Sequence, residues 1–448
     1  MMSELLEIAK RVAGWARDGE QVEAFVSRDD ETEVRAYGGE VESLVRAQSQ
    51  GVGVRVVVDG RQGYAYAGTL DDQALEETLR EARDNATFSE PDEFNGIAEP
   101  DGVQPPQLNL FSEELARYST DDKVALALEL ERATRAADPR ISGIESAEYI
   151  DSVYESAVAS SAGIEATTRE TGCYVSAYAL ATANEETQTG FGFSLGRHPG
   201  ELDPSVAAAD AAERATRLLG ATKPSSERLT VVFDPWVTAQ FLGVVGHTLT
   251  GEAVVKGRSL FAGRLGEAVA HPSITLVDDP TNPAAFTASL VDGEGLATRR
   301  TPLLVDGVLQ AFLHNSSTGR RTGHRSTGSA VRAGYKSGPS VGARSLSLVP
   351  GTASQTELVA GIENGFLVQG VAGLHSGVNP VSGDFSTGAE GLRIRGGELA
   401  EPIREVTIAS TVQRLLLDVE AIGGDVVWLP MSAAGVTVVV ADVAMSGD

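Results

Sequence analysis

Four two-residue turns constrain the fold of this chain more than any other feature of its sequence. They are Gly38-Gly39, Asp59-Gly60, Asp306-Gly307 and Gly396-Gly397, and β-prone residues flank each pair. Gly-Gly and Asp-Gly pairs readily adopt the positive φ angles of tight hairpins, so each predicts two antiparallel strands joined at that point. Because the first two turns follow closely on each other, we expect residues 21–68 to form an antiparallel sheet with one buried face.

Helical patterns follow this first group of strands. Residues 70–86 begin at acidic residues and place Leu75, Leu79 and Ala82 on one face, and residues 121–137 begin in the same way behind Ser119. Between them, residues 88–109 are rich in Pro, Gly and acidic residues, which is typical of a surface loop. Residues 141–195 alternate as strands again, and an alanine-rich helix then ends before Gly220.

A domain boundary is expected in the segment ATKPSSER, so we divide the chain into residues 1–222 and 223–448. Beyond it, the strand LTVVFDP stops at Asp234-Pro235, a pair that caps and begins a helix. The remainder is mostly strand and Gly-rich loop, with helices expected near residues 354–364 and 410–422. These patterns predict an α+β protein with an N-terminal antiparallel sheet covered by helices and a β-rich C-terminal domain.

Charge and composition exclude several classes of function. The chain carries 36 Lys and Arg residues against 63 Asp and Glu residues, a formal charge of −27 that disfavours direct binding to nucleic acid or anionic membranes. Its single cysteine, Cys173, lies in an apolar strand-like stretch and is expected to be a buried structural thiol. The N-terminus reads as an amphipathic helix without the pattern of a signal peptide, and no apolar run is long enough to span a bilayer, so we expect a cytoplasmic protein.

Seven segments resemble the TldD/TldE (PmbA) metallopeptidase family in their order and approximate spacing. They include VVFDP, GHTLTGEAVVKGRS, STGSA and NPVSGDFSTGAEGLRIRGGEL in the C-terminal part, and GGEVESLVRAQSQGVGVRVVVDGRQGYAY near the N-terminus. The resemblance therefore covers nearly the whole chain. It implies a family whose TldD branch carries a HExxxH helix motif, in which two histidines bind zinc and the glutamate activates water.

The matching stretch here, LGVVGHTLTGE, departs from that motif. Leu242 takes the first histidine position, Gly243 takes the glutamate position, and His247 is the only residual ligand; Glu252 stands where an acidic residue closes the motif. The cysteine that the resemblance implies as third ligand has no counterpart near the C-terminus. The chain thus resembles the TldE/PmbA branch most closely, its C-terminal domain carrying a degenerate metal-motif helix. We predict no metal or other cofactor on this chain.

Four other residues are candidates for facing a peptide or a partner. Arg299 and Arg300 belong to a locally basic cluster with Arg320 and Arg321, which could meet carboxylates, although solvation or intramolecular pairing is the more common use of such clusters. Asp384 lies in the Gly-rich segment 383–391, and His314 stands beside a Ser-Ser-Thr triplet. This triplet lacks the G-x-S-x-G elbow of serine hydrolases, and the Gly-rich segment lacks the GKS ending of a phosphate loop.

The resemblance implies a noncatalytic TldE-like subunit that joins a zinc-bearing TldD-like partner to degrade or process unfolded peptides. Two alternatives stay open. One is a divergent metallopeptidase or other hydrolase that uses His247 with unrecognised ligands. The other is a protein-binding modulator without proteolysis, linked to DNA gyrase control as the older naming of the family suggests. We therefore leave open whether the chain alone is an enzyme.

Overall fold

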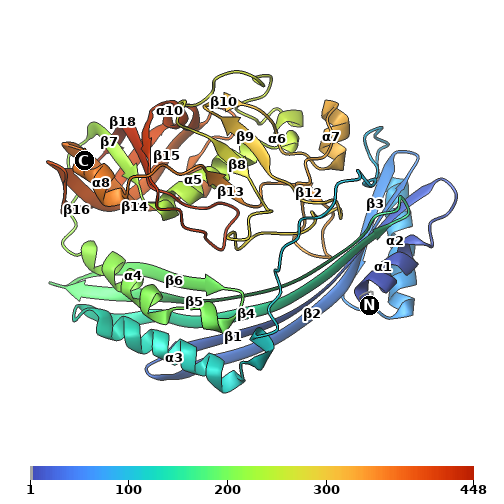
Figure 1. The fold of residues 1–448 in the computed structure, drawn as a ribbon, viewed down its shortest axis with the longest axis horizontal. Helices are drawn as coiled ribbons and strands as arrows, with labels where there is room; N and C mark the ends of the chain where they lie inside the picture. The colour runs from blue at the N-terminus through green and yellow to red at the C-terminus, as the bar shows by residue number, and fades with distance from the viewer. Residues whose placement is uncertain (1–3, 448) are drawn as a thin grey trace.

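The computed structural model describes residues 4–447, without the side chains of residues 375 and 376. Its N-terminal half is built on a six-stranded antiparallel sheet in the order β3-β2-β1-β4-β5-β6. These strands are β1 (Glu20–Tyr37), β2 (Glu40–Val58), β3 (Arg61–Ala67), β4 (Ile141–Ser160), β5 (Glu165–Ala183) and β6 (Glu186–Gly196). Figure 1 shows the sheet as a long curved band, with the C-terminal half of the chain lying against its concave side.

All four predicted hairpin turns are confirmed. Gly38-Gly39 joins β1 to β2, Asp59-Gly60 joins β2 to β3, and the other two pairs join strands of the C-terminal half. Each of the eight turn residues has a positive φ angle, between 48° at Asp306 and 84° at Gly39. A fifth turn of this kind, Asn184-Glu185 between β5 and β6, has no glycine to reveal it in the sequence.

Two pairs of helices cover the N-terminal sheet. They are α1 (Glu4–Ala13) with α2 (Asp72–Phe88), and α3 (Thr120–Ala137) with α4 (Pro204–Arg217). As predicted, Leu75, Leu79 and Ala82 of α2 are buried, and Ser119 caps α3 through a capping box. Helix α2 lies so close to β3 that a Cβ atom at Gly63 would come within 1.9 Å of the Ala82 carbonyl oxygen. The lack of a side chain at this glycine therefore permits the packing.

The C-terminal half contains a second six-stranded sheet, in the order β16-β15-β14-β7-β18-β17. An additional pairing of β16 with β18 closes five of these strands into a circuit. Its strands are β7 (Glu227–Phe233), β14 (Asn364–Ala372), β15 (Asp384–Arg395), β16 (Glu398–Thr411), β17 (Val419–Ile422) and β18 (Val438–Ser446). The shorter strands of this half are β8 (Leu276–Asp278), β9 (Thr301–Val305), β10 (Val308–Leu309), β11 (Ala330–Val331), β12 (Ser340–Val341) and β13 (Leu346–Leu348).

The helices of the C-terminal half are short. They are α5 (Pro235–Thr248), α6 (Gly251–Val255), α7 (Ser316–Thr322), α8 (Gln355–Ala360), α9 (Leu374–Gly377) and α10 (Val412–Leu417). The helices expected near residues 354–364 and 410–422 are shorter than predicted, because α8 gives way to β14 and α10 to β17. Residues 419–422 pair with β18, so sheet hydrogen bonds replace helical ones there. Among the described residues, no helix is long and apolar enough to cross a bilayer.

Candidate functional site

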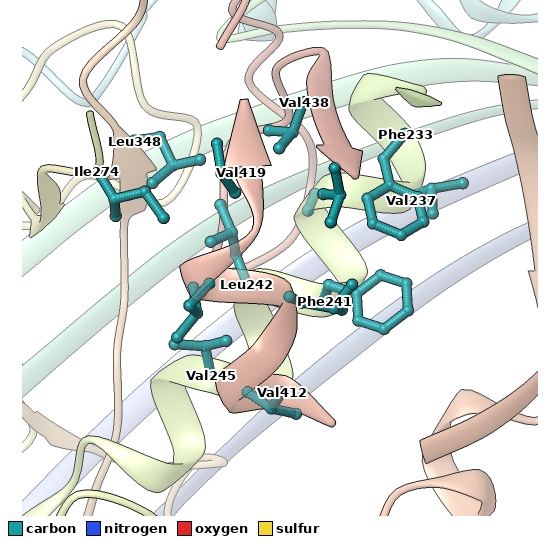
Figure 2. Packing of buried hydrophobic residues seen from close by; sticks show 14 of the residues in the cluster. Phe233, Val237, Phe241, Leu242, Val245, Ile274, Leu348, Val412, Val419 and Val438 are labelled. Atoms are coloured by element: carbon teal, nitrogen blue, oxygen red, sulfur yellow. The ribbon is translucent and has the colours of Figure 1, made fainter. Parts of the chain in front are cut away.

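Helix α5 carries the degenerate metal motif and begins as the sequence predicts. The Asp234 carboxylate accepts a hydrogen bond from the Trp236 backbone N–H at 2.9 Å, and Pro235 occupies the first turn. Leu242 is 4% exposed and packs in the largest hydrophobic cluster of the molecule. Figure 2 shows Leu242 and Val245 pointing from α5 into the cluster that also holds Val412 and Val419.

The other motif positions point elsewhere. A Cβ atom at Gly243 would have no neighbour within 4 Å, so this position is open. The His247 side chain is exposed. Glu252, which closes the motif, is on α6 and forms an ion pair with Lys256 one turn later. Leu242 and His247 thus occupy different environments, one in hydrocarbon and one at the surface.

The residues around this helix do not fit a zinc site. Zinc in proteins takes three or four ligands from Cys, His, Asp and Glu. Throughout the described part of the chain, no three such residues come together in a way that could hold a metal ion. Cys173 is buried on β5, in the other half, where its thiol lies 3.5 Å from the Gly196 carbonyl oxygen. Burial raises the pKa of this thiol to about 12, as expected for a structural cysteine.

The basic cluster pairs mainly with the loop that connects α2 to α3. Arg299 forms an ion pair with Asp101 at 2.6 Å, and Arg321 forms one with Asp92. Arg320 donates to the carbonyl oxygens of Phe94, Gly96 and Ile97 at 3.0, 2.6 and 3.3 Å. Arg300 instead lies 3.8 Å from Asp279. Three of the four arginines therefore hold residues 88–109, which we call the connecting loop.

The connecting loop is not the simple surface loop that its composition predicts. Apart from Phe88, the last residue of α2, it has no helix or strand, in agreement with the prediction, but Ile97 and Ala98 are 2% and 1% exposed. The arginine contacts explain the difference, because they satisfy backbone carbonyls that would otherwise need water. In Figure 1 this loop runs between the N-terminal sheet and the C-terminal half.

The two remaining candidates have separate neighbours. His314 is 4% exposed, stacks on His324 with ring centroids 5.4 Å apart, and packs against Gly251. Burial, and secondarily the charge of His324, lowers the pKa of His314 to about 4, so its ring is neutral at physiological pH. Asp384 is exposed at the start of β15 and accepts a hydrogen bond from Ser382 at 2.6 Å.

A feature that the sequence analysis missed is a buried charge cluster of two carboxylates and two guanidiniums, Glu23, Glu294, Arg55 and Arg332. Glu23 on β1 is the direct cross-strand partner of Arg55 on β2, and their side chains meet at 2.6 Å. Arg332 bonds Glu23 from the C-terminal half, and Glu294 lies 3.4 Å from Arg55. Burial alone would raise the pKa of Glu23, but the two guanidiniums outweigh it and hold this pKa below its usual value.

Next to this cluster lies the inner cavity, about 570 Å³ in volume, between the concave face of the N-terminal sheet and the C-terminal half. Alternate strand residues such as Ser152 and Ser156 line it with hydroxyl groups. Its charged lining is balanced, with carboxylates from Asp29, Glu170 and Asp292 and cations from Arg332, Lys336 and Arg344. Burial raises the pKa of both Asp29 and Glu170. The wall suits polar groups such as peptide amides better than a strongly charged ligand.

Three sequence profiles of one family match this chain in order. The profile of the PmbA/TldA metallopeptidase domain 1 matches residues 22–86, that of the central domain matches residues 113–219, and that of the C-terminal domain matches residues 226–447. Together they cover both sheets, the α5 helix and the segments that form the inner cavity.

Individual relatives agree with these profiles over nearly the whole length. The metalloprotease PmbA of Escherichia coli O157:H7 is 26% identical over 429 residues, which cover 95% of this chain and 92% of that protein. A candidate modulator of a DNA gyrase from Thermotoga maritima has a crystal structure with a TM-score of 0.89 and 25% identity, covering 98% and 99% of the two chains. TldE from Thermococcus kodakarensis shares the fold, with a TM-score of 0.87, 23% identity and coverage of 95% and 97%. With all three domains matched in order, the chain belongs to the PmbA/TldD/TldE metallopeptidase family.

Proposed function

We propose that this chain is the noncatalytic, TldE-like subunit of a cytoplasmic two-component zinc metallopeptidase that degrades or processes unfolded peptides. A TldD-like partner holds the zinc and the glutamate that activates water. This chain contributes a surface that binds the partner and part of the cavity that holds the peptide. It acts in proteolysis without supplying the nucleophile.

The observation that carries this proposal is the chemistry of α5. At the two positions where the catalytic branch has a histidine and a glutamate, this chain has Leu242 in a hydrocarbon environment and Gly243 without a side chain. A positioned general base contributes about 10² to 10⁴ in rate, so its loss is large. A single exposed His247 cannot replace three ligands.

The experiment combines metal analysis with reconstitution. The purified chain should contain well under one zinc per monomer and should not cleave unfolded peptides. Mixing it with the TldD homologue from the same cell should produce chelator-sensitive peptidase activity, and a Glu→Gln change in the motif of that partner should abolish it. A matched control is His247→Ala in this chain, which should leave both the zinc content and the activity of the mixture unchanged.

Two outcomes would contradict the proposal. Stoichiometric zinc that is lost on His247→Ala, together with peptidase activity of the chain alone, would favour a divergent enzyme. Failure to associate with the TldD homologue, combined with retention on immobilised DNA gyrase, would favour the modulator role that the description of the Thermotoga relative suggests.

A further inference from the structure

A second cavity, which we call the aromatic cavity, lies where the N-terminal sheet meets the beginning of α5. Its volume is about 660 Å³, within the range of small-molecule binding sites. Strands β5 and β6 and helix α4 line it from the N-terminal half, and α5, β14 and β15 line it from the C-terminal half. The site is therefore built by both halves of the chain, directly beside the motif helix.

Four aromatic rings form one wall of this cavity. Tyr178 on β5 and Phe191 on β6 are direct cross-strand partners with ring centroids 4.7 Å apart. The ring centroid of Trp236 on α5 lies 5.3 Å from that of Phe191 and 5.9 Å from that of Phe193. None of the four rings is fully buried, and Tyr178 is 42% exposed. The wall thus presents ring surface that the protein itself does not cover.

The other walls are acidic, and half of their carboxylates lack partners. The cavity is lined by one guanidinium, Arg214, and by four carboxylates, Asp210, Asp234, Glu390 and Asp425. Arg214 pairs with Asp234 at 3.1 Å, and Asp425 accepts a hydrogen bond from Thr437 at 2.6 Å. The carboxylates of Glu390 and Asp210 form no hydrogen bond or ion pair with any described residue, although the charge of Arg214 acts on Asp210, and desolvation raises the pKa of both.

A buried amide adds a further acceptor without a partner. Gln369 is 7% exposed and lines the cavity, yet its Oε1 atom has no hydrogen-bond partner among the described residues. A buried acceptor without a partner loses its hydrogen bond to water and gains none in return, and a donor on a ligand would restore the lost bond.

The backbone is irregular at this point. Gln369 is the extra residue of a β-bulge between β14 and β15, because Val368 pairs with Gly391 while Gly370 pairs with Glu390. A Cβ atom at Gly370 would lie 2.9 Å from Glu390 Oε1, so the glycine leaves room for the carboxylate. Bulges commonly redirect side chains at functional sites, and this one brings Gln369 and Glu390 to the same cavity.

The exposed aromatic rings, together with the unpaired carboxylates and the unpaired amide oxygen, indicate a cationic ligand with an apolar stem. Because the whole chain is acidic, negative charge alone would not distinguish this cavity, and the inner cavity has a balanced lining. Aromatic faces attract cations, and unpaired carboxylate and amide oxygens accept hydrogen bonds without offering any in return. A guanidinium fits better than an ammonium, since its planar group presents five donors and also stacks on rings.

We propose that the aromatic cavity binds the side chain of an arginine residue in an extended peptide. The guanidinium bonds Glu390 and Gln369, with Asp210 at the mouth, and the methylene stem lies against the rings of Tyr178, Phe191 and Trp236. The peptide nature of the ligand rests on the proposed function. The recognition of a guanidinium rests on this cavity alone.

Calorimetric titration of the purified single chain tests the proposal. The probes are acetyl-Gly-Gly-Arg-Gly-Gly-amide, the same peptide with citrulline, which has a nearly identical shape but no charge, and N-acetylarginine amide. The arginine peptide should bind about tenfold or more tightly than the citrulline peptide, and more weakly as salt is added. Equal affinity for the two peptides, or no binding of the arginine peptide, would overturn the proposal. Tighter binding of N-acetylarginine amide than of the peptide would assign the site to a free guanidino compound and overturn its peptide part.

Two variants locate the binding. Glu390→Gln keeps the volume of the side chain and removes its charge. It should lower the affinity for the arginine peptide about fivefold or more. Its matched control is Glu398→Gln, an exposed glutamate of the neighbouring strand β16, which should change affinity less than twofold. Tyr178→Leu, at an exposed position that tolerates substitution, should also weaken binding. Unchanged affinity in Glu390→Gln and Tyr178→Leu would place the binding elsewhere and contradict the assignment.

These results are independent of the reconstitution with a TldD homologue. Loss of arginine-dependent binding would refute the cavity assignment and leave the subunit role intact. Arginine-dependent binding by a chain that does not assemble with the homologue would refute the subunit role and leave the cavity assignment intact.

Discussion

At the scale of single residues, charged side chains inside apolar strands mark the junction between the two halves. Glu23 stands in VEAFV and Arg55 in GVRVVV, and both are buried because each is the other's cross-strand partner. Removing one member of a buried ion pair costs about 3–5 kcal/mol, since it leaves the other charge uncompensated. These two interruptions of apolar runs are the signal that could have revealed the cluster from the sequence.

Asp292 provides a prediction on pH. It is 3% exposed, and burial followed by the charge of Glu294 raises its pKa from 3.8 to about 7, despite three backbone N–H groups that bond its carboxylate. The folded state therefore binds this proton more tightly than the unfolded state. The stabilising effect of this proton is complete below the pKa that Asp292 has in the unfolded state, and it is lost as pH rises through about 7.

We expect the free energy of unfolding to fall between about pH 4 and pH 7 by at most about 1.4 kcal/mol per pH unit from this residue. Asp292→Asn should remove that part of the slope, as measured by urea unfolding at several pH values. Asp278→Asn is the matched comparison, because burial raises the pKa of Asp278 only to about 6, so its contribution ends at lower pH. An unchanged slope in Asp292→Asn would contradict the assignment.

At the scale of elements, the sequence predicts the turns and helix starts whose conformation depends on a few neighbouring residues. Four hairpins with Gly-Gly or Asp-Gly pairs, the capped start of α3 and the Asp-Pro start of α5 could all be predicted from a few neighbouring residues. The Asn184-Glu185 turn was missed because glutamate rarely adopts a positive φ angle. The burial of the connecting loop could not be predicted because it depends on arginines that lie 198 to 229 residues away in the sequence.

Arg320 should control the order of the connecting loop. Arg320→Ala removes the bonds to the carbonyls of Phe94, Gly96 and Ile97 and leaves these acceptors without their donor. Local opening should then become more frequent, and limited proteolysis within residues 88–109 should accelerate about tenfold or more. Arg325→Ala, at a nearby exposed arginine, serves as the control and should not change the cleavage rate. Equal protease resistance of the two variants would mean that the bonds from Arg320 do not control the order of the loop.

At the scale of the whole molecule, the motif helix lies between two environments. One side of α5 faces hydrocarbon through Leu242, and its N-terminal end borders the aromatic cavity through Trp236 and Gln240. The degenerate motif could be read from the sequence, whereas the cavity could not, because its walls come from strands and helices that only the tertiary fold brings together. The degenerate metal motif and the aromatic cavity thus share one helix.

Restoring the motif in this chain should not restore catalysis. Leu242→His places an imidazole among Phe241, Val412 and their neighbours, where an unpaired polar group costs about 1–3 kcal/mol. A Cβ atom at Gly243 has no neighbour within 4 Å, so Gly243→Glu has room at that atom, but the single cysteine, Cys173, is buried on β5 in the other half, and no three metal-binding side chains come together in the described part of the chain. The double variant should therefore melt at a lower temperature than the wild type, retain no stoichiometric zinc after dialysis, and show no chelator-sensitive peptidase activity alone.

The single variant Gly243→Glu is the control. Its melting temperature should be unchanged, which would assign the lower melting temperature of the double variant to the buried imidazole of Leu242→His. Zinc binding and peptide cleavage by the double variant would show that two substitutions suffice to build a metal centre, and the noncatalytic assignment would then rest on the two missing side chains alone.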